Sequence, residues 1–206
     1  MKLIRSTLAS LALVFTSNVA LAGDWGSTSL GERLAHRNCA WCHGTSGQGF
    51  ATAPRLAGQT RQYIENQIAS SRNHMRDNPK TQAFMWGVAA LTSREAAVHL
   101  AEYFSSLSAR PANDGNERLT AEGRALYRDG SPAANIPSCV VCHGPNGEGR
   151  AEIPRLGGLS YRYLKRKLEQ WGEGYHATAL VPMPGIATKL SAGDIEAISS
   201  YLSFVE

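Results

Sequence analysis

The 206-residue sequence has little of several features, and each shortage excludes a class of protein. It holds only four cysteines, and all of them stand in two short motifs, so none is left over as a separate catalytic or ligating thiol. Strand-like alternation of apolar and polar residues is nearly absent, which argues against a β-rich fold. After residue 22, no apolar run is long enough to cross a bilayer.

Charge of one sign is not concentrated either. Residues 23–110 carry nine basic and six acidic side chains, and residues 111–206 carry ten basic and eleven acidic ones. A nucleic-acid-binding protein would show a clustered basic stripe, which this sequence lacks, so no nucleic-acid partner is expected. The mild asymmetry between the two halves suits electrostatic steering toward a partner better than tight ionic binding.

The first 22 residues have the pattern of a secretory signal peptide. Lys2 and Arg5 form a basic start, residues 8–15 form a short apolar run, and residues 20–22 match an A-x-A cleavage site. An uncleaved anchor is the alternative, but the apolar run falls short of the ~20 residues that a membrane span needs. We therefore expect residues 1–22 to be removed and the remaining chain to lie outside the cytoplasm.

What the sequence does contain is a C-x-x-C-H motif that occurs twice. The six motif residues are Cys39, Cys42, His43, Cys139, Cys142 and His143. Local disulfides, a redox-active dithiol and a zinc site are the alternatives, but none of them explains the histidine directly after each pair. Covalent haem explains it, because two thiols on one helical turn can bond both vinyl groups of a porphyrin while the next imidazole binds the iron. We therefore expect two covalently bound haem c groups.

The motifs are part of a longer internal repeat. Residues 39–68 align with residues 139–168 without a gap, and 12 of the 30 positions are identical. Each copy predicts a helix, the haem motif, a glycine-rich loop, a second helix, a second loop and a final helix. The sequence therefore predicts an all-α protein with two tandem haem domains, residues 23–110 and residues 111–206, each built of a few helices around its haem.

Two pairs of repeated residues refine this prediction. Ser93 and Ser191 precede the final helix of each copy and are expected to cap it. Gly31 and Gly123 stand at equivalent places in the first helix. They either let that helix approach the final one closely or simply face solvent.

The second axial ligand of each iron decides between a carrier and a catalyst. Met85 and Met183 are 98 positions apart, as are the final helices, whereas Met75 has no counterpart. The matched pair therefore predicts ligation, with core filling as the alternative. None of the remaining histidines has a histidine counterpart, and they are expected to be ordinary helix or loop residues: His36, His74, His99 and His176.

These stretches together resemble the cytochrome c4 family, periplasmic di-haem proteins made of two class I cytochrome c domains. The matching segments are CAWCHG, RLAGQTRQYI, HLAEYFSSL, GRALY, IPSCVVCHGPNGEG and IPRLGG, and the resemblance covers nearly all of the chain after residue 22. It implies His/Met ligation in both domains, by His43 with Met85 and by His143 with Met183. It also implies that the carbonyls of Pro54 and Pro154 accept the histidine N–H groups.

The resemblance further implies an electron carrier and not an enzyme. Electrons would pass in the periplasm from a quinol-oxidising cytochrome bc complex to a terminal oxidase or reductase; the protein is either soluble or peripherally associated with the membrane, and the sequence leaves both alternatives open. An electron-transfer subunit of a dedicated dehydrogenase is the alternative. A di-haem enzyme of the peroxidase or thiosulfate dehydrogenase type is a weaker one, because it needs an openable iron or an unusual ligand such as cysteine.

Two further expectations concern the surroundings of the haems. Phe84 and Trp86 make the first methionine loop bulky, whereas Pro182 and Pro184 make the second rigid, so we expect unequal reduction potentials. Trp86 also departs from the family pattern. The arginines at positions 55 and 155 are repeated in both copies and either pair with haem propionates or face solvent.

Overall fold

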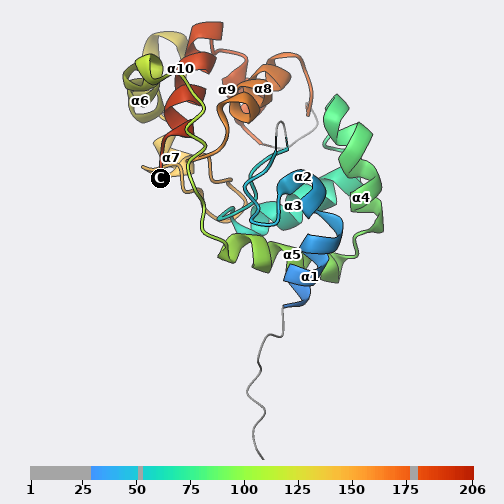
Figure 1. Ribbon diagram of the computed structural model, residues 1–206. Helices are drawn as coiled ribbons and strands as arrows, with labels where there is room; N and C mark the ends of the chain where they lie inside the picture. Colours follow the sequence, from blue (N-terminus) through green and yellow to red (C-terminus); the bar gives the residue numbers. More distant parts are fainter. Residues whose placement is uncertain (1–28, 51–52, 177–180) are drawn as a thin grey trace, which may run out of the picture.

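The computed structural model describes residues 29–50, 53–176 and 181–206. The predicted signal peptide, residues 1–22, lies outside this part of the chain. The described residues form two helical lobes, one from each copy of the repeat, which lie side by side and are joined by an extended segment (Figure 1). They contain no strand beyond two isolated bridges, so the predicted all-α class is confirmed.

The first lobe contains the helices of the first copy. They are α1 (Leu30–Asn38), α2 (Ala40–His43), α3 (Arg61–Arg72), the π-helical turn η1 (Thr81–Met85), α4 (Trp86–Leu91) and α5 (Arg94–Ser106). The second lobe repeats this order with small differences. Its elements are η2 (Glu117–Leu119), α6 (Thr120–Asp129), η3 (Pro132–Ala134), α7 (Val140–His143), α8 (Tyr161–Gly172), α9 (Met183–Ala187) and α10 (Ala192–Ser203).

The final helices begin where the sequence predicts. The Ser93 hydroxyl accepts a hydrogen bond from the Ala96 N–H at the start of α5. Ser191 does the same for the Asp194 N–H at the start of α10, and the Asp194 carboxylate accepts from the Ser191 N–H in return. Each cap satisfies N–H groups that the first helical turn leaves without a partner.

Close helix crossings explain the two repeated glycines. A Cβ atom on Gly31 would lie under 3.0 Å from the carbonyl oxygen of His99 in α5. A Cβ atom on Gly123 would meet the carbonyl oxygen of Ala197 in α10 in the same way. Of the two alternatives, the close approach is therefore correct, and α1 and α6 pack backbone to backbone on the final helix of their own lobe.

Each lobe has its own apolar core. In the first lobe the buried members are Ala35, Ile64, Leu100, Ala101 and Phe104. In the second lobe they are Leu126, Tyr127, Ile136, Leu159, Leu164, Ile198 and Leu202. The first cysteine of each haem motif, Cys39 or Cys139, packs against the core of its lobe, so the motif is attached directly to the hydrophobic interior.

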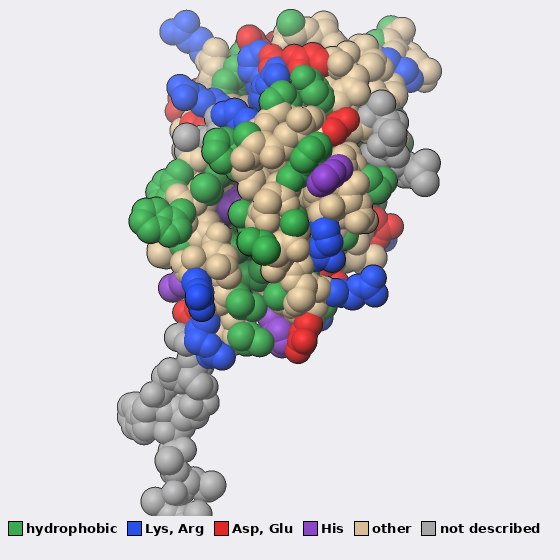
Figure 2. Space-filling model, turned by 90° about the vertical axis from the view of Figure 1, so that its right-hand side faces the viewer, with side chains coloured by type: hydrophobic (Ala, Val, Ile, Leu, Met, Phe, Trp, Pro, Cys, Tyr) green, Lys and Arg blue, Asp and Glu red, His purple; other side chains and the backbone are tan. Residues whose placement is uncertain are grey.

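The surface agrees with the charge pattern of the sequence. On the face drawn in Figure 2, basic and acidic side chains lie mostly toward the upper and lower margins, and hydrophobic and other uncharged groups cover much of the middle. This face therefore presents no continuous basic stripe of the kind that binds nucleic acid. Of the helices in the described residues, none is both long and apolar enough to span a membrane.

Candidate functional site

The two haem motifs form the same short helical turn in both lobes. The first cysteine of each pair is the N-cap of α2 or α7 and is half-buried, the second lies in the helix and is exposed, and neither pair forms a disulfide. Burial, assisted by the neighbouring Cys42, raises the pKa of the Cys39 thiol to about 11, and burial beside Cys142 does the same for Cys139. The motif thus presents two adjacent thiols, one against the core and one at the surface.

Each motif histidine is buried and held in one orientation. His43 Nδ1 lies 2.8 Å from the Pro54 carbonyl oxygen, and His143 Nδ1 lies 3.0 Å from that of Pro154. Because a carbonyl only accepts, Nδ1 carries the proton and the Nε2 lone pair of each ring is left for a metal. Burial is the largest influence on both histidines and holds the pKa of each below its usual value. Both rings are therefore neutral at neutral pH, as metal ligation requires.

These residues fit a covalently bound haem. The cysteines supply two thiols on one turn, and the histidine supplies an imidazole whose second nitrogen is already engaged. Apolar side chains at repeated positions stand beside each motif and suit the faces of a porphyrin. They are Leu56, Ile64 and Ile68 in the first lobe and Leu156, Leu164 and Leu168 in the second.

The two predicted methionine ligands lie on different local structures. Met85 ends the π-helical turn η1, which packs against α3, and Met183 is the first residue of α9, which packs against α8. Both side chains are half-buried. A π-helical turn is rare and frequently marks a functional position. The assignment of Met85 and Met183 as iron ligands stays a prediction.

Trp86 anchors the first methionine loop. Its ring stacks on His74 with centroids 4.0 Å apart and an interplanar angle of 17°, and its Nε1–H donates to the Arg76 carbonyl at 3.0 Å. The residue after Met85 is thereby tied to the loop that follows α3. The second lobe uses proline at the equivalent places, Pro182 and Pro184, which restricts the backbone itself.

The other histidines considered as ligands have protein partners. His36 lies 3.3 Å from the Tyr103 hydroxyl, His99 lies 3.4 Å from the Glu102 carboxylate, and His74 stacks on Trp86. His176 is buried and contacts the opposite lobe. The first three therefore agree with their interpretation as ordinary residues, whereas His176 has a role at the lobe junction that its sequence context did not indicate.

The lobes are joined by side chains that bond backbone groups across the junction. Gln59 Nε2 donates to the Arg155 carbonyl at 3.0 Å, and Gln59 Oε1 accepts from the Arg155 N–H at 2.7 Å. Thr60 donates to the Ala151 carbonyl. The guanidinium groups of the repeated arginines are directed to backbone oxygens, Arg55 to Arg110 at 2.9 Å and Arg155 to Gly157 at 2.8 Å. Their pairing with propionates stays a prediction.

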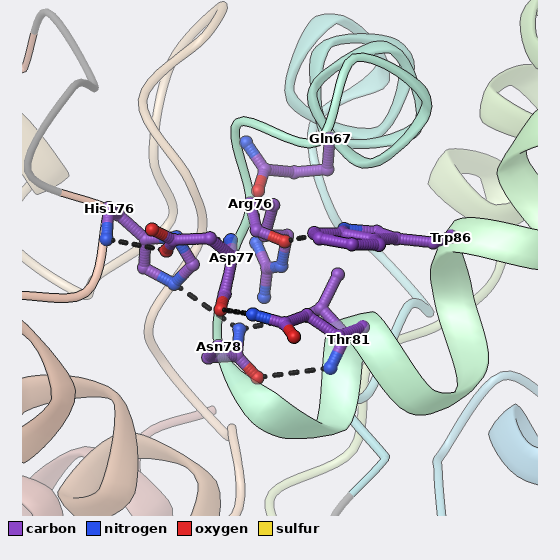
Figure 3. A network of polar contacts seen from close by, with 8 residues as sticks. Gln67, Arg76, Asp77, Asn78, Thr81, Trp86 and His176 are labelled. Carbon is purple, nitrogen blue, oxygen red and sulfur yellow. Dashed lines mark hydrogen bonds and ion pairs between the residues drawn. The ribbon is translucent and has the colours of Figure 1, made fainter.

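His176 forms the centre of a second cross-lobe network (Figure 3). Its ring Nδ1 lies 3.1 Å from the Asp77 carboxylate, and its Nε2 lies 3.2 Å from the Asn78 amide nitrogen. The Asn78 side chain is oriented by Thr81, whose N–H donates to Asn78 Oδ1 at 3.1 Å. The Asp77 N–H donates to Nδ1 at 3.2 Å and the Asn78 amide faces Nε2, so N–H groups of the first lobe face both ring nitrogens, which suits a neutral ring better than a protonated one. Burial, with Lys167 and Arg76 nearby, lowers the pKa of His176 to about 4 although Asp77 opposes this.

The junction residues are the functional features that sequence reasoning missed. The sequence contained one indication of the lobe junction, because Arg76 and His176 occupy equivalent positions in the two copies. The backbone confirms this: Met75 N–H donates to Ser70 and Tyr175 N–H donates to Gln170, both at 2.9 Å. The loops differ at this residue, since His176 has a φ of 60° and Arg76 has no positive φ, and only the fold shows that the two side chains face each other's lobe.

Comparison with known proteins is consistent with this geometry. The family model of cytochrome c matches residues 28–108 and again residues 120–205. Cytochrome c4 of Pseudomonas aeruginosa is 34% identical over 98% of this chain and 97% of its own length. A thiosulfate dehydrogenase electron acceptor of Stutzerimonas stutzeri is 35% identical over 100% of this chain and 97% of its own. The crystal structure of reduced recombinant cytochrome c4 from Pseudomonas stutzeri superposes with a TM-score of 0.77, at 30% identity, over 85% of this chain and 97% of that one.

Proposed function

Because the chain belongs to the cytochrome c family, and within it to the cytochrome c4 group, we propose that it shuttles electrons in the periplasm between a quinol-oxidising cytochrome bc complex and a terminal oxidase or reductase. The family and the fold make the protein a di-haem electron carrier with two covalently bound haem c groups. The observation that carries the proposal is the duplicated motif, in which a buried histidine is locked by a proline carbonyl in both lobes.

The protein side chains would hold each haem in the same way. Cys39 and Cys42 would form the two thioether bonds in the first lobe, with His43 and Met85 as the iron ligands. The second lobe would use Cys139 and Cys142, with His143 and Met183. When bound, haem c supplies an iron that takes up and releases one electron.

The protein residues orient the haem ligands and tune the properties of the metal. The Pro54 and Pro154 carbonyls keep each imidazole in one tautomer and one orientation, which limits reorganisation when the charge of the site changes. A thioether ligand is neutral and holds the reduced metal comparatively well, which raises the potential. If a histidine and a methionine side chain hold each iron, they would leave no place for peroxide or oxygen, and the site would pass electrons only.

The ligand assignment is tested by spectroscopy of the oxidised holoprotein. The far-red charge-transfer band should have the intensity expected for two iron–methionine bonds per molecule. Met85→Ala and Met183→Ala should each remove half of it, while Met75→Ala, which changes an exposed methionine without a counterpart, should leave it intact. Full wild-type intensity of the band in Met85→Ala or Met183→Ala would contradict the assignment for that lobe.

A second electron donor has specific support. One relative that spans the whole chain is named a thiosulfate dehydrogenase electron acceptor, so a dedicated dehydrogenase is the competing donor. The two are distinguished by reducing the purified holoprotein either with a bc complex and quinol or with a thiosulfate dehydrogenase and thiosulfate. Faster reduction by the bc complex supports the proposed function, and reduction by the dehydrogenase alone contradicts it.

A further inference from the structure

Arg76 lies in the loop after α3, at the junction between the lobes, and is fixed at both ends. Its carbonyl accepts the Trp86 Nε1–H bond at 3.0 Å. Its guanidinium donates to Gln67 in α3 and, at 3.1 Å, to the hydroxyl of Tyr163 in α8 of the opposite lobe. Figure 3 shows Arg76 between Gln67 and Asp77, beside the Trp86 ring. The positive charge is therefore held in one place, between the two halves of the molecule.

The partners of this guanidinium carry no charge. Gln67 offers an amide oxygen, and Tyr163 and Tyr63 offer phenols. Burial raises the pKa of Tyr63 to about 12, so that phenol is neutral at neutral pH. Within residues 29–50, 53–176 and 181–206, no Asp or Glu carboxylate forms an ion pair with Arg76. Asp77, the next residue, is engaged by His176.

The charge is also poorly hydrated. Part of the residue's surface is accessible, yet burial is the largest influence on its guanidinium and acts to lower the pKa. The phenols of Tyr163 and Tyr63 act in the opposite direction, and the net pKa lies above the usual value, so Arg76 stays protonated. A cation shielded from water costs free energy unless an anion lies beside it. The described protein residues do not supply that anion.

The haem that the first lobe binds carries carboxylates of its own, in its two propionates. Arg76 belongs to this lobe: its guanidinium donates to Gln67 of α3, next to Ile68, which packs against the core, and its carbonyl accepts from Trp86, the residue after Met85. We propose that the Arg76 guanidinium is the counter-ion of a propionate of the haem attached at Cys39 and Cys42. This inference rests on the proposed ligation of that haem by His43.

The pairing makes the two haem sites electrostatically different. The equivalent position in the second lobe is His176, which burial and its neighbours keep neutral. Only the first of these two positions therefore holds a fixed cation. An arginine pairs with a carboxylate through a fork of N–H donors, which fixes the position of the charge. A positive charge paired with a haem propionate would favour the reduced state, so Arg76 would raise the potential of the first haem.

The experiment is a redox titration of the holoprotein in which the haems are resolved by their spectra. Arg76→Gln should lower the potential of the first haem, which means an about tenfold smaller ratio of reduced to oxidised haem at a fixed solution potential. Arg76→Lys keeps a charge and should retain most of the wild-type potential. Arg162→Gln, which removes an exposed arginine of α8, is the matched control and should change neither potential.

A second variant covers the case in which Arg76→Gln fails to fold. Gln67→Glu leaves Arg76 in place and adds a carboxylate at the atom that already accepts its N–H, so it competes with the propionate for the same cation. Like Arg76→Gln, this variant should lower the potential of the first haem. Infrared spectra of holoprotein with isotope-labelled propionate carboxyls give a direct readout, because loss of the cation should raise the pH at which one propionate of this haem titrates.

Each other outcome overturns the proposal. If Arg76→Gln weakens thermal stability but moves neither the potential nor the propionate titration, Arg76 is only a link between the lobes. If Arg76→Lys acts like Arg76→Gln, the lost hydrogen bonds and not the charge are responsible. If the wild-type potential varies with inorganic phosphate concentration and that variation disappears in Arg76→Gln, the anion comes from solution. Failure of the ligand assignment is distinguished from these outcomes, because it would appear as absence of the far-red band in the wild-type protein.

Discussion

The first lobe and the second share one backbone plan but differ in the loop between the middle helix and the methionine. In the first lobe this loop runs into a π-helical turn, and Trp86 ties it to His74 and to the Arg76 carbonyl. In the second lobe prolines flank Met183, and His176 reaches across to Asp77 and Asn78. The haem motifs themselves are nearly identical in geometry. The residues after the middle helices reach the lobe junction, so their differences can make two equal cofactors unequal.

The cores differ as well. The buried core of the first lobe includes two alanines, Ala35 and Ala101, while that of the second is made of larger side chains, including the fully buried Tyr127. A half of about 90 residues has a limited core, so an apolar cofactor contributes a large share of its stability. We infer that the first lobe depends more strongly on its haem than the second.

Removal of each haem tests this inference and should have the largest effect. The double variants Cys39→Ser/Cys42→Ser and Cys139→Ser/Cys142→Ser should each lower the haem content from two to one per chain. Far-ultraviolet circular dichroism should show loss of helix in both variants and a greater loss in the first. Equal losses would contradict the difference between the cores, and full retention of helix would contradict the dependence on haem.

The two close helix crossings should lose similar stability on substitution, because both lobes have the same arrangement of helices. Gly31→Ala and Gly123→Ala each place a Cβ against a carbonyl oxygen of the final helix, and we expect a loss of about 3 kcal/mol in the free energy of unfolding. Urea unfolding of the holoprotein, followed lobe by lobe through the haem spectra, measures this.

The control for these variants uses glycines in the shorter helices. A Cβ atom added to Gly87 in α4 or to Gly185 in α9 would have nothing within 4 Å, so their alanine variants should be neutral or stabilising by roughly 0.5–1 kcal/mol. A large loss in Gly123→Ala with none in Gly31→Ala would show that the crossings are not equivalent.

His176 should produce the smallest effect, as a dependence of stability on pH. Its pKa is about 4 in the folded protein and close to the ordinary histidine value of 6.5 when unfolded, so the unfolded state binds more protons below pH 6.5. The contribution of the neutral His176 ring to the free energy of unfolding is therefore fully present above pH 6.5 and is lost as the pH falls toward 4. Between pH 7 and pH 5.5 the loss should be about 1 kcal/mol.

The free energy of unfolding is measured against pH for the wild-type holoprotein and for His176→Gln, in which residue 176 cannot titrate. The groups that face His176 are Lys167, whose pKa burial lowers to about 6, and Arg76, which both disfavour its protonation, and Asp77, which favours it. An unchanged pH dependence in His176→Gln would show that its ring titrates normally in the fold.

Much of the site could be predicted from the sequence because covalent haem attachment is a local requirement. Two thiols and an imidazole must lie on one helical turn, so five consecutive residues are sufficient to indicate the cofactor. The repeat then supplied the helix order, the capping roles of Ser93 and Ser191, and the pairing of Met85 with Met183. The proline carbonyls behind both histidines follow from the family resemblance and are present at 2.8 and 3.0 Å.

The lobe junction could not be predicted in this way, because its contacts join residues about 90 to 100 positions apart that carry no common motif. Arg76 meets Tyr163, Gln59 meets Arg155, and His176 meets Asp77 only because two packed lobes bring their loops together. The sequence by itself determined the cofactor, its number and the all-α fold, since these depend on short-range spacing and periodicity. Only the tertiary structure decided which charges face each other between the lobes, since desolvation and charge pairing depend on what surrounds a residue in space.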